Sequence, residues 1–188
     1  MSKFQKRVKE AIKLGLNLND QQIQEEYYLG QFISPWKQSN NKNNKQMGHR
    51  RADLRISGKN TIYKVSRFVI IEADGNQHDN PNNKWNDPDK LYTRAQKFND
   101  QIDRDYWENL KVNEDGGIMI RIKEPIGYDE DPNTYYERLN RLLEKLQKPG
   151  YMSNIIQDAE NKKAKGVIVS WDNEKFIITK SWPKPKYI

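Results

Sequence analysis

The residues best suited to chemistry lie at the end of an apolar run, in the stretch Phe68 to His78. Four successive apolar residues predict a strand buried on both faces, and Glu72 and Asp74 follow at its end. Alternate side chains of a strand point to the same side, so these two carboxylates share one face. They would repel each other unless a cation lay between them, and a divalent cation with oxygen ligands is the usual solution. The stretch therefore predicts the active-site strand of a metal-dependent enzyme.

A third carboxylate, Asp53, lies within Arg50 to Ile56, whose alternation predicts a half-buried strand next to the first. Adjacent strands can bring Asp53 against Glu72 or Asp74, so that the carboxylates share one ion. A metal held there would polarise a phosphodiester oxygen, neutralise developing charge and lower the pKa of an attacking water. These three residues are the predicted metal ligands.

A histidine and a helix complete the predicted constellation. His78 follows Asp74 by four residues, and could act as a general acid or base or bind the metal; a loop histidine with no role is the alternative. A long helix should begin at Asp87-Pro88 and end near Lys111. At about 100° per residue, Asp105 projects toward the sheet, Arg94 lies along the same edge, and Arg104 projects outward.

The other elements follow from periodicity and turn signals. Helical spacing is expected at Phe4 to about Leu18, at Gln21 to about Ile33 after an Asn19-Asp20 cap, and at Thr134 to Gln147. Strands are expected at Thr61 to Val65, at Ile118 to Ile122, and in a hairpin from Lys165 to Lys180. On the first helix, basic residues crowd the polar side. They could bind phosphate, although a helix face that is simply exposed to solvent is the alternative interpretation.

Composition limits the classes of protein to consider. The chain has 188 residues, which suits one domain, and a formal net charge of +7, which favours a polyanionic partner. It has no cysteines, so disulfides, thiolate catalysis and cysteine-bound zinc are excluded. No apolar run approaches the length of a membrane span and no signal peptide is evident, so a soluble, cytoplasmic protein is expected. Abundant Asn, Lys and Tyr would fit a phage or mobile element.

The order of these motifs resembles a known nuclease group. The motifs are Arg51-x-Asp53-Leu-Arg-Ile, Ile-Ile-Glu72-x-Asp74-Gly-x-x-His78, Arg104-Asp105 on a helix, and Gly-x-x-Ile-Arg121 on a strand. This arrangement is similar to the very-short-patch-repair-like branch of the PD-(D/E)xK nucleases, which includes mismatch-nicking repair endonucleases and phage homing endonucleases with a Glu, Asp, His, Asp site pattern. The similarity covers about residues 50–123, somewhat under half of the chain.

The resemblance implies a fold and an activity. The fold is α/β, with a restriction-endonuclease-like αβββαβ core at 50–147 whose mixed central sheet is flanked by helices. N-terminal helices at 1–35 and a C-terminal β-hairpin and tail at 165–188 complete a single nuclease domain. The activity is cleavage of DNA that depends on Mg²⁺ or Mn²⁺, by a monomer or a homodimer.

The resemblance also implies roles for individual residues. Asp53 becomes the central metal ligand, Glu72 or Asp74 the strand ligands, His78 the base and Asp105 a supporting carboxylate. An upstream glutamate falls on Glu25 or Glu26, of which Glu26 enters the predicted site. The arginines expected to contact nucleic acid are Arg51, Arg55, Arg94, Arg104 and Arg121. The wider superfamily has a lysine where this chain has Asp74, and the repair enzymes' zinc ligands cannot be cysteines here.

Three hypotheses follow. The leading one is a Mg²⁺-dependent DNA endonuclease that nicks or cuts both strands. The alternative is a catalytically inactive nucleic-acid-binding module that keeps the nuclease fold, for which the missing lysine is the hint. In the third, Glu72 and Asp74 hold a structural ion in a protein that interacts with other proteins. DNA binding would then be absent or would lack the steep salt dependence that phosphate contacts cause.

Overall fold

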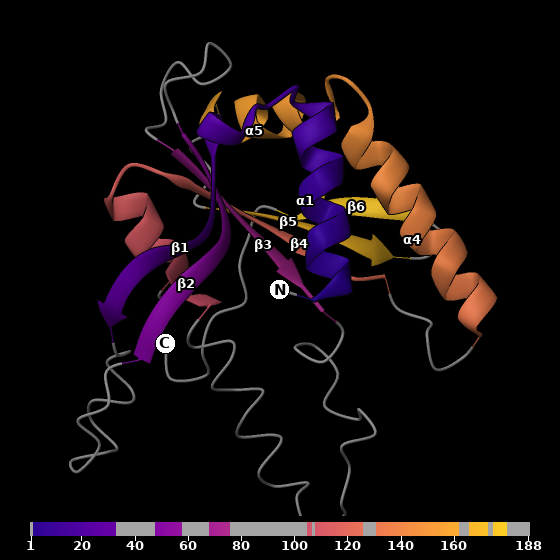
Figure 1. Cartoon of the computed structure of the whole chain (residues 1–188), viewed down its shortest axis with the longest axis horizontal. Helices are drawn as coiled ribbons and strands as arrows, with labels where there is room; N and C mark the ends of the chain where they lie inside the picture. The colour runs from indigo at the N-terminus through magenta and orange to yellow at the C-terminus, as the bar shows by residue number, and fades with distance from the viewer. Residues whose placement is uncertain are drawn as a thin grey trace, which may run out of the picture.

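The computed structural model describes residues 2–32, 48–57, 68–75, 105–106, 108–125, 131–161, 166–172 and 175–179. In this part of the chain a mixed sheet has the strand order β1-β2-β3-β4-β5-β6 (Figure 1). Its strands are β1 (Ile23–Phe32), β2 (Gly48–Ser57), β3 (Phe68–Asp74), β4 (Ile118–Lys123), β5 (Gly166–Asp172) and β6 (Lys175–Thr179). The first three strands are antiparallel neighbours, β3, β4 and β5 run parallel, and β6 turns back along β5. The general α/β class predicted from the sequence is confirmed.

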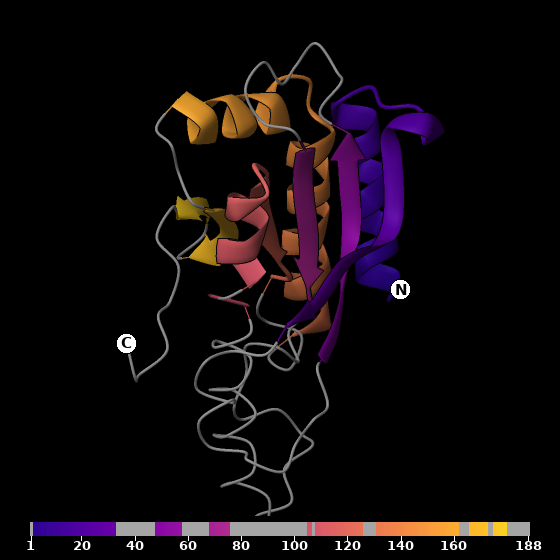
Figure 2. The ribbon, with the colours of Figure 1, turned by 90° about the vertical axis from the view of Figure 1, so that its left-hand side faces the viewer.

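Helices cover the two faces of this sheet. α1 (Lys3–Gly15) and α4 (Pro132–Gln147) lie side by side on one face, and α5 (Tyr151–Asn161) crosses one end (Figures 1 and 2). A helical segment at 105–106 and 108–114 lies on the opposite face. No helix of the described ranges is long and apolar enough to cross a membrane.

The core is split by the sheet into two apolar clusters. The larger one lies under α1, α4 and α5 and includes Ile71 and Ile120; the smaller one lies under the 108–114 segment and includes Ile70 and Met119. Every residue of β3 is buried, because the strand lies inside the sheet and is covered on both faces. The prediction of a strand buried on both faces is therefore confirmed, although only one of its neighbours, β2, is antiparallel and the other, β4, is parallel.

The predicted helix at Gln21 to Ile33 is wrong. Asn19 does cap a helical turn, but that turn is a short 3₁₀ segment, Asp20–Gln22, and the chain then continues as β1. Backbone pairing of β1 with β2 outweighs a helical spacing that few residues supported. Glu26 has a left-handed backbone, with φ of 46°, and the register with β2 shifts further on, between Tyr28 and Gly30. The predicted N-terminal helices are thus one helix and an edge strand.

Two further differences lie toward the C-terminus. The hairpin of β5 and β6 does not form an appendage, because β5 pairs in parallel with β4 and so extends the central sheet. α5 was not predicted, although Met152, Ile155, Ile156 and Ala159 have helical spacing and are all buried. The predicted strand at 61–65 lies outside the described residues, as does most of the long predicted helix.

Candidate active site

Asp53 lies where β2 and β3 stop pairing. The pairing of the two strands ends at Leu54 and Ile71. Past this pair, the Asp53 side chain contacts the backbone of β3 in place of a backbone–backbone hydrogen bond. Its Oδ2 accepts a hydrogen bond from the Ala73 N–H at 2.8 Å, and its Oδ1 accepts one from Nε2 of Gln5 at 2.7 Å. The carboxylate is therefore held between a strand and the first turn of α1.

Gln5 links this carboxylate to the start of the helix. Its side-chain oxygen accepts a hydrogen bond from the Ser2 N–H, and the Ser2 hydroxyl accepts one from the Gln5 N–H, which is a capping box. The same amide group thus caps α1 with its oxygen and orients Asp53 with its nitrogen. Gln5 is a positioning residue that the sequence analysis missed, since nothing local indicated that α1 begins over β2.

Glu72 is bound between two other carboxyl groups. Asp53 and Glu108 are both close enough to affect the pKa of Glu72, and only 8% of Glu72 is exposed. These three neighbouring acids are called the carboxyl chain below; their like charges disfavour the ionised forms unless protons or another cation neutralise them. Glu108 was also missed, although it follows Asp105 by three residues and shares its helix face.

The electrostatics of this carboxyl chain favour a bound proton. Burial is the main reason that the pKa of Glu72 is well above its ordinary value, and the charges of Glu108 and Asp53 raise it further. The nearby Arg121 guanidinium opposes the shift. Burial also raises the pKa of Asp53, against the hydrogen bonds from Ala73 and Gln5. Both shifts therefore favour the neutral forms of these acids.

A second buried cluster surrounds Arg121, which pairs in register with Glu72 across β3 and β4. Its Nε and Nη2 donate to the two oxygens of Asp74 at 2.8 and 3.0 Å, and its Nη1 lies 2.6 Å from Oδ1 of Asp105. Lys123 places its Nζ 2.9 Å from Oδ2 of Asp74. These acids raise the pKa of Arg121 against the effect of burial, so the guanidinium stays charged.

The structure thus separates the predicted metal ligands. Asp53 and Glu72 are in contact, whereas both oxygens of Asp74 accept hydrogen bonds from Arg121, and one of them also contacts Lys123. Among the described residues, no three His, Asp or Glu side chains are placed to hold one metal ion as they stand. The cation that the sequence required beside Asp74 is therefore an arginine and a lysine of the neighbouring strand.

The other predicted site residues have different positions. Asp105 faces the sheet, as the helix projection predicted, and pairs with Arg121. Glu26 is exposed on β1, and the neighbouring Glu25 forms an ion pair with Lys9 of α1. His78, Arg94 and Arg104 lie outside the described residues, as does the side chain of Arg51.

Two of the arginines predicted to contact nucleic acid are engaged within the fold. Arg121 is buried, with 4% exposed, among the acids of the second cluster. Arg55 is half-buried, and its guanidinium lies 4.8 Å from the ring centre of Tyr27 and 5.0 Å from that of Phe68. Such stacking over aromatic faces is favourable for a guanidinium. The structure therefore explains both arginines by packing and ion pairing within the sheet.

Comparison with known proteins found no match: no family model, no curated protein and no solved structure matches this chain.

The carboxyl chain predicts a pH-dependent stability. A carboxyl group whose pKa is higher in the folded protein than in the unfolded chain stabilises the fold below its ordinary pKa, and this contribution is lost as the pH rises. In EDTA, the free energy of unfolding should therefore fall as the pH rises above about 4.5, the ordinary pKa of glutamate, by up to about 1.4 kcal/mol per pH unit for one group. Urea denaturation across pH 5 to about 8 measures this slope.

Two variants test the origin of that slope. Glu72→Gln should flatten it, since an amide does not ionise, while Glu137→Gln, on the exposed surface of α4, should keep the wild-type profile. A Glu72→Gln protein with an unchanged slope would contradict the assignment.

Proposed function

We propose that this chain is a Mg²⁺-dependent DNA endonuclease. The observation that carries the proposal is the buried carboxyl chain, in which Glu72 lies between Asp53 and Glu108. Three acids in contact inside a fold are unfavourable unless a cation or protons neutralise them. Oxygen donors of this type are the ligands that Mg²⁺ and Mn²⁺ prefer.

The donor set fits a divalent cation in its chemistry. Asp53 and Glu72 would hold the ion, with Glu108 next to them, and their raised pKa values indicate that their negative charges are not fully compensated within the protein. When bound, such an ion supplies the polarisation of a phosphoryl oxygen and the acidity of an attacking water. The protein's own residues orient the ligands: Gln5 and the Ala73 N–H each fix one oxygen of Asp53.

Positive groups beside the carboxyl chain suit an anionic substrate. Lys123 lies at the end of β4 with 18% of its side chain exposed, and Asp74 holds its ammonium group. The superfamily that the sequence resembles has a lysine at the position of Asp74, and here Lys123 is the register partner of Asp74 on the next strand. In the proposed function, Lys123 neutralises charge that develops on the phosphate.

Supercoiled plasmid tests the proposal. The purified protein should nick or cut it in Mg²⁺ and stop in EDTA. Asp53→Asn keeps the shape of the side chain but removes its charge, and it should lower the rate about 100-fold or more, as expected for loss of a group that stabilises the transition state. Asp115→Asn, on an exposed turn, is the matched control and should cut normally. Equal rates for Asp53→Asn and wild type would refute the site.

The alternative function is a nucleic-acid-binding module without cleavage. The observation in its favour is that both carboxylate oxygens of Asp74, a predicted ligand, accept hydrogen bonds from Arg121, and that one of them also contacts Lys123. Calorimetric titration with Mg²⁺ separates the two functions. A nuclease should bind Mg²⁺ and lose that affinity in Asp53→Asn, whereas a binding module should bind DNA with no carboxylate-dependent affinity for the ion.

A further inference from the structure

The basic residues of α1 fall into two groups that the sequence alone could not separate. Lys9 forms an ion pair with Glu25 and lies 3.6 Å from Glu10, and Lys13 forms an ion pair with Asp20. Their charges are therefore neutralised within the protein. These pairs also attach the later turns of α1 to the chain segment around β1.

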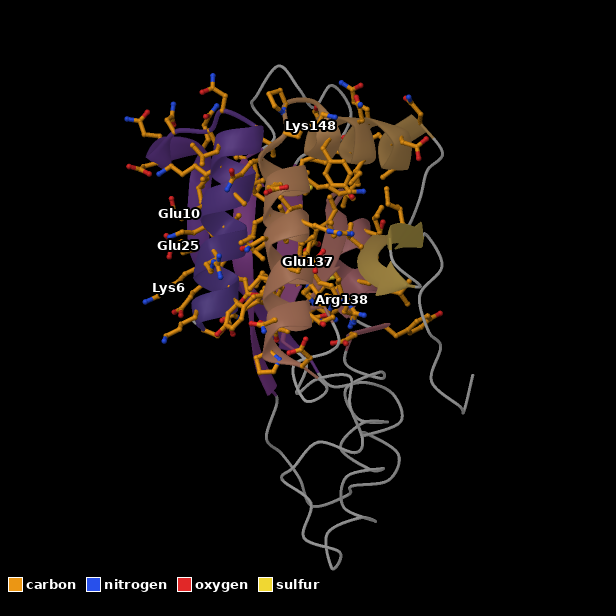
Figure 3. All side chains as sticks on the ribbon, turned by 90° about the vertical axis from the view of Figure 1, so that its right-hand side faces the viewer. Lys6, Glu10, Glu25, Glu137, Arg138 and Lys148 are labelled. Atoms are coloured by element: carbon orange, nitrogen blue, oxygen red, sulfur yellow. The ribbon has the colours of Figure 1, made fainter. Side chains whose placement is uncertain are left out.

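The cations near the start of α1 have no such partners in the part of the chain that the structure describes. Lys3 and Lys6 are exposed, and no acidic side chain of the described residues pairs with either of them. Arg7, also exposed, donates to the neutral Asn140 at 3.4 Å, and it forms no ion pair with an acid of the described ranges. Figure 3 shows Lys6 on the outer side of α1, nearer the start of the helix than Glu10, and pointing away from the body of the molecule. The first two turns therefore present unneutralised positive charge.

These turns lie beside the candidate active site. Gln5, between Lys3 and Lys6 in the chain, bonds to Asp53. The start of α1 and the end of β3, which carries Glu72 and Asp74, lie at the same end of the sheet (Figures 1 and 2). A polyanion in contact with Lys3 and Lys6 would thus run past the carboxyl chain.

We propose that the first two turns of α1 bind the phosphate backbone of a nucleic acid next to the active site, through Lys3, Lys6 and Arg7. The inference rests on the proposed nuclease function and specifies where its substrate lies. Exposed cations without acidic partners are attracted to phosphate and release its counterions on binding. A membrane surface is a poorer partner, because the apolar side of α1, with Phe4 and Val8, is buried against the sheet and cannot insert.

A pair of double variants tests the proposal. Lys3→Gln/Lys6→Gln and Lys9→Gln/Lys13→Gln each remove two positive charges from the same helix, so both reduce the formal net charge from +7 to +5. Binding of a labelled DNA duplex is measured by fluorescence anisotropy in EDTA, between about 50 and 200 mM salt. The slope of log K against log salt should become shallower by about 1.8 in the first variant, for two lost phosphate contacts, and stay near wild type in the second.

The outcomes separate this inference from the proposed function. Equal slopes in the two variants, or a wild-type slope in Lys3→Gln/Lys6→Gln, would overturn the surface, as would a wild-type protein that binds no duplex or binds anionic vesicles in preference. DNA binding that weakens in the first variant, without plasmid cleavage in Mg²⁺, would keep the surface and reject the nuclease. Circular dichroism of both variants confirms that each retains the fold.

Discussion

Replacing Glu72 by glutamine should reduce Mg²⁺-dependent DNA cleavage by about 100- to 1000-fold without unfolding the protein. Glutamine has nearly the shape of glutamate, and its amide can donate a hydrogen bond toward the neighbouring Asp53 or Glu108. It cannot carry the negative charge that a divalent cation requires. The expected result is a folded protein with an intact sheet and very low activity.

Stability distinguishes this result from simple damage to the core. Above about pH 4.5 the Glu72→Gln protein should be at least as stable as wild type in EDTA, because the buried amide carries no cost of ionisation. Plasmid cleavage rates and urea denaturation midpoints measure the two effects on one preparation. The control is Glu144→Gln, on the exposed side of α4, which should match wild type in both. Cleavage by Glu72→Gln within threefold of wild type would exclude the carboxyl chain as the catalytic centre.

Replacing Arg121 by methionine should destabilise the fold by about 3–5 kcal/mol at neutral pH, the cost of breaking a buried ion pair. The change removes the guanidinium from between Asp74 and Asp105 and leaves acids behind in a buried position. Arg121→Lys should recover part of the loss, because one ammonium cannot reproduce three separate contacts. Urea denaturation, monitored by circular dichroism, measures both.

A double variant and a surface control sharpen this prediction. Asp74→Asn should be less harmful in the Arg121→Met background than in wild type, since the acid that lost its partner is also removed. Arg141→Met breaks only an exposed pair with Glu137 and should cost less than about 1 kcal/mol. If Arg121→Met costs no more than Arg141→Met, the buried cluster does not stabilise the fold. The prediction also replaces the sequence-based interpretation of Arg121 as a DNA contact with a structural one.

The two clusters have complementary places in the proposed mechanism. The chain through Glu72 carries excess negative charge, while Asp74, Arg121, Asp105 and Lys123 form a network in which acids and bases alternate. The second network fixes the ends of β3 and β4 next to the first. In the proposed nuclease, such a rigid network of charges would keep the metal ligands in position during the reaction.

Local patterns in the sequence were sufficient for several features. The apolar run before Glu72 predicted a strand buried on both faces, and helical spacing predicted α1 and α4. The position of Asp105 toward the sheet followed from helical periodicity, and strand adjacency predicted that Asp53 lies near Glu72 or Asp74 without deciding between them. Each of these depends on residues close in the chain or on a simple alternation of side chains.

Only the tertiary structure decided which charges meet. The parallel register of β3 with β4 pairs Asp74 with Lys123 and Glu72 with Arg121, and no pattern within either strand determines that register. The position of α1 over β2 brings Gln5 to Asp53, and the pairing of β1 with β2 turns a predicted helix into a strand. The sequence by itself determined that two carboxylates at the end of β3 needed a cation. The fold decided that Asp74 obtains its cation from Arg121 and Lys123, whereas Glu72 lies against other acids, because contacts between distant segments depend on packing and register rather than on local spacing.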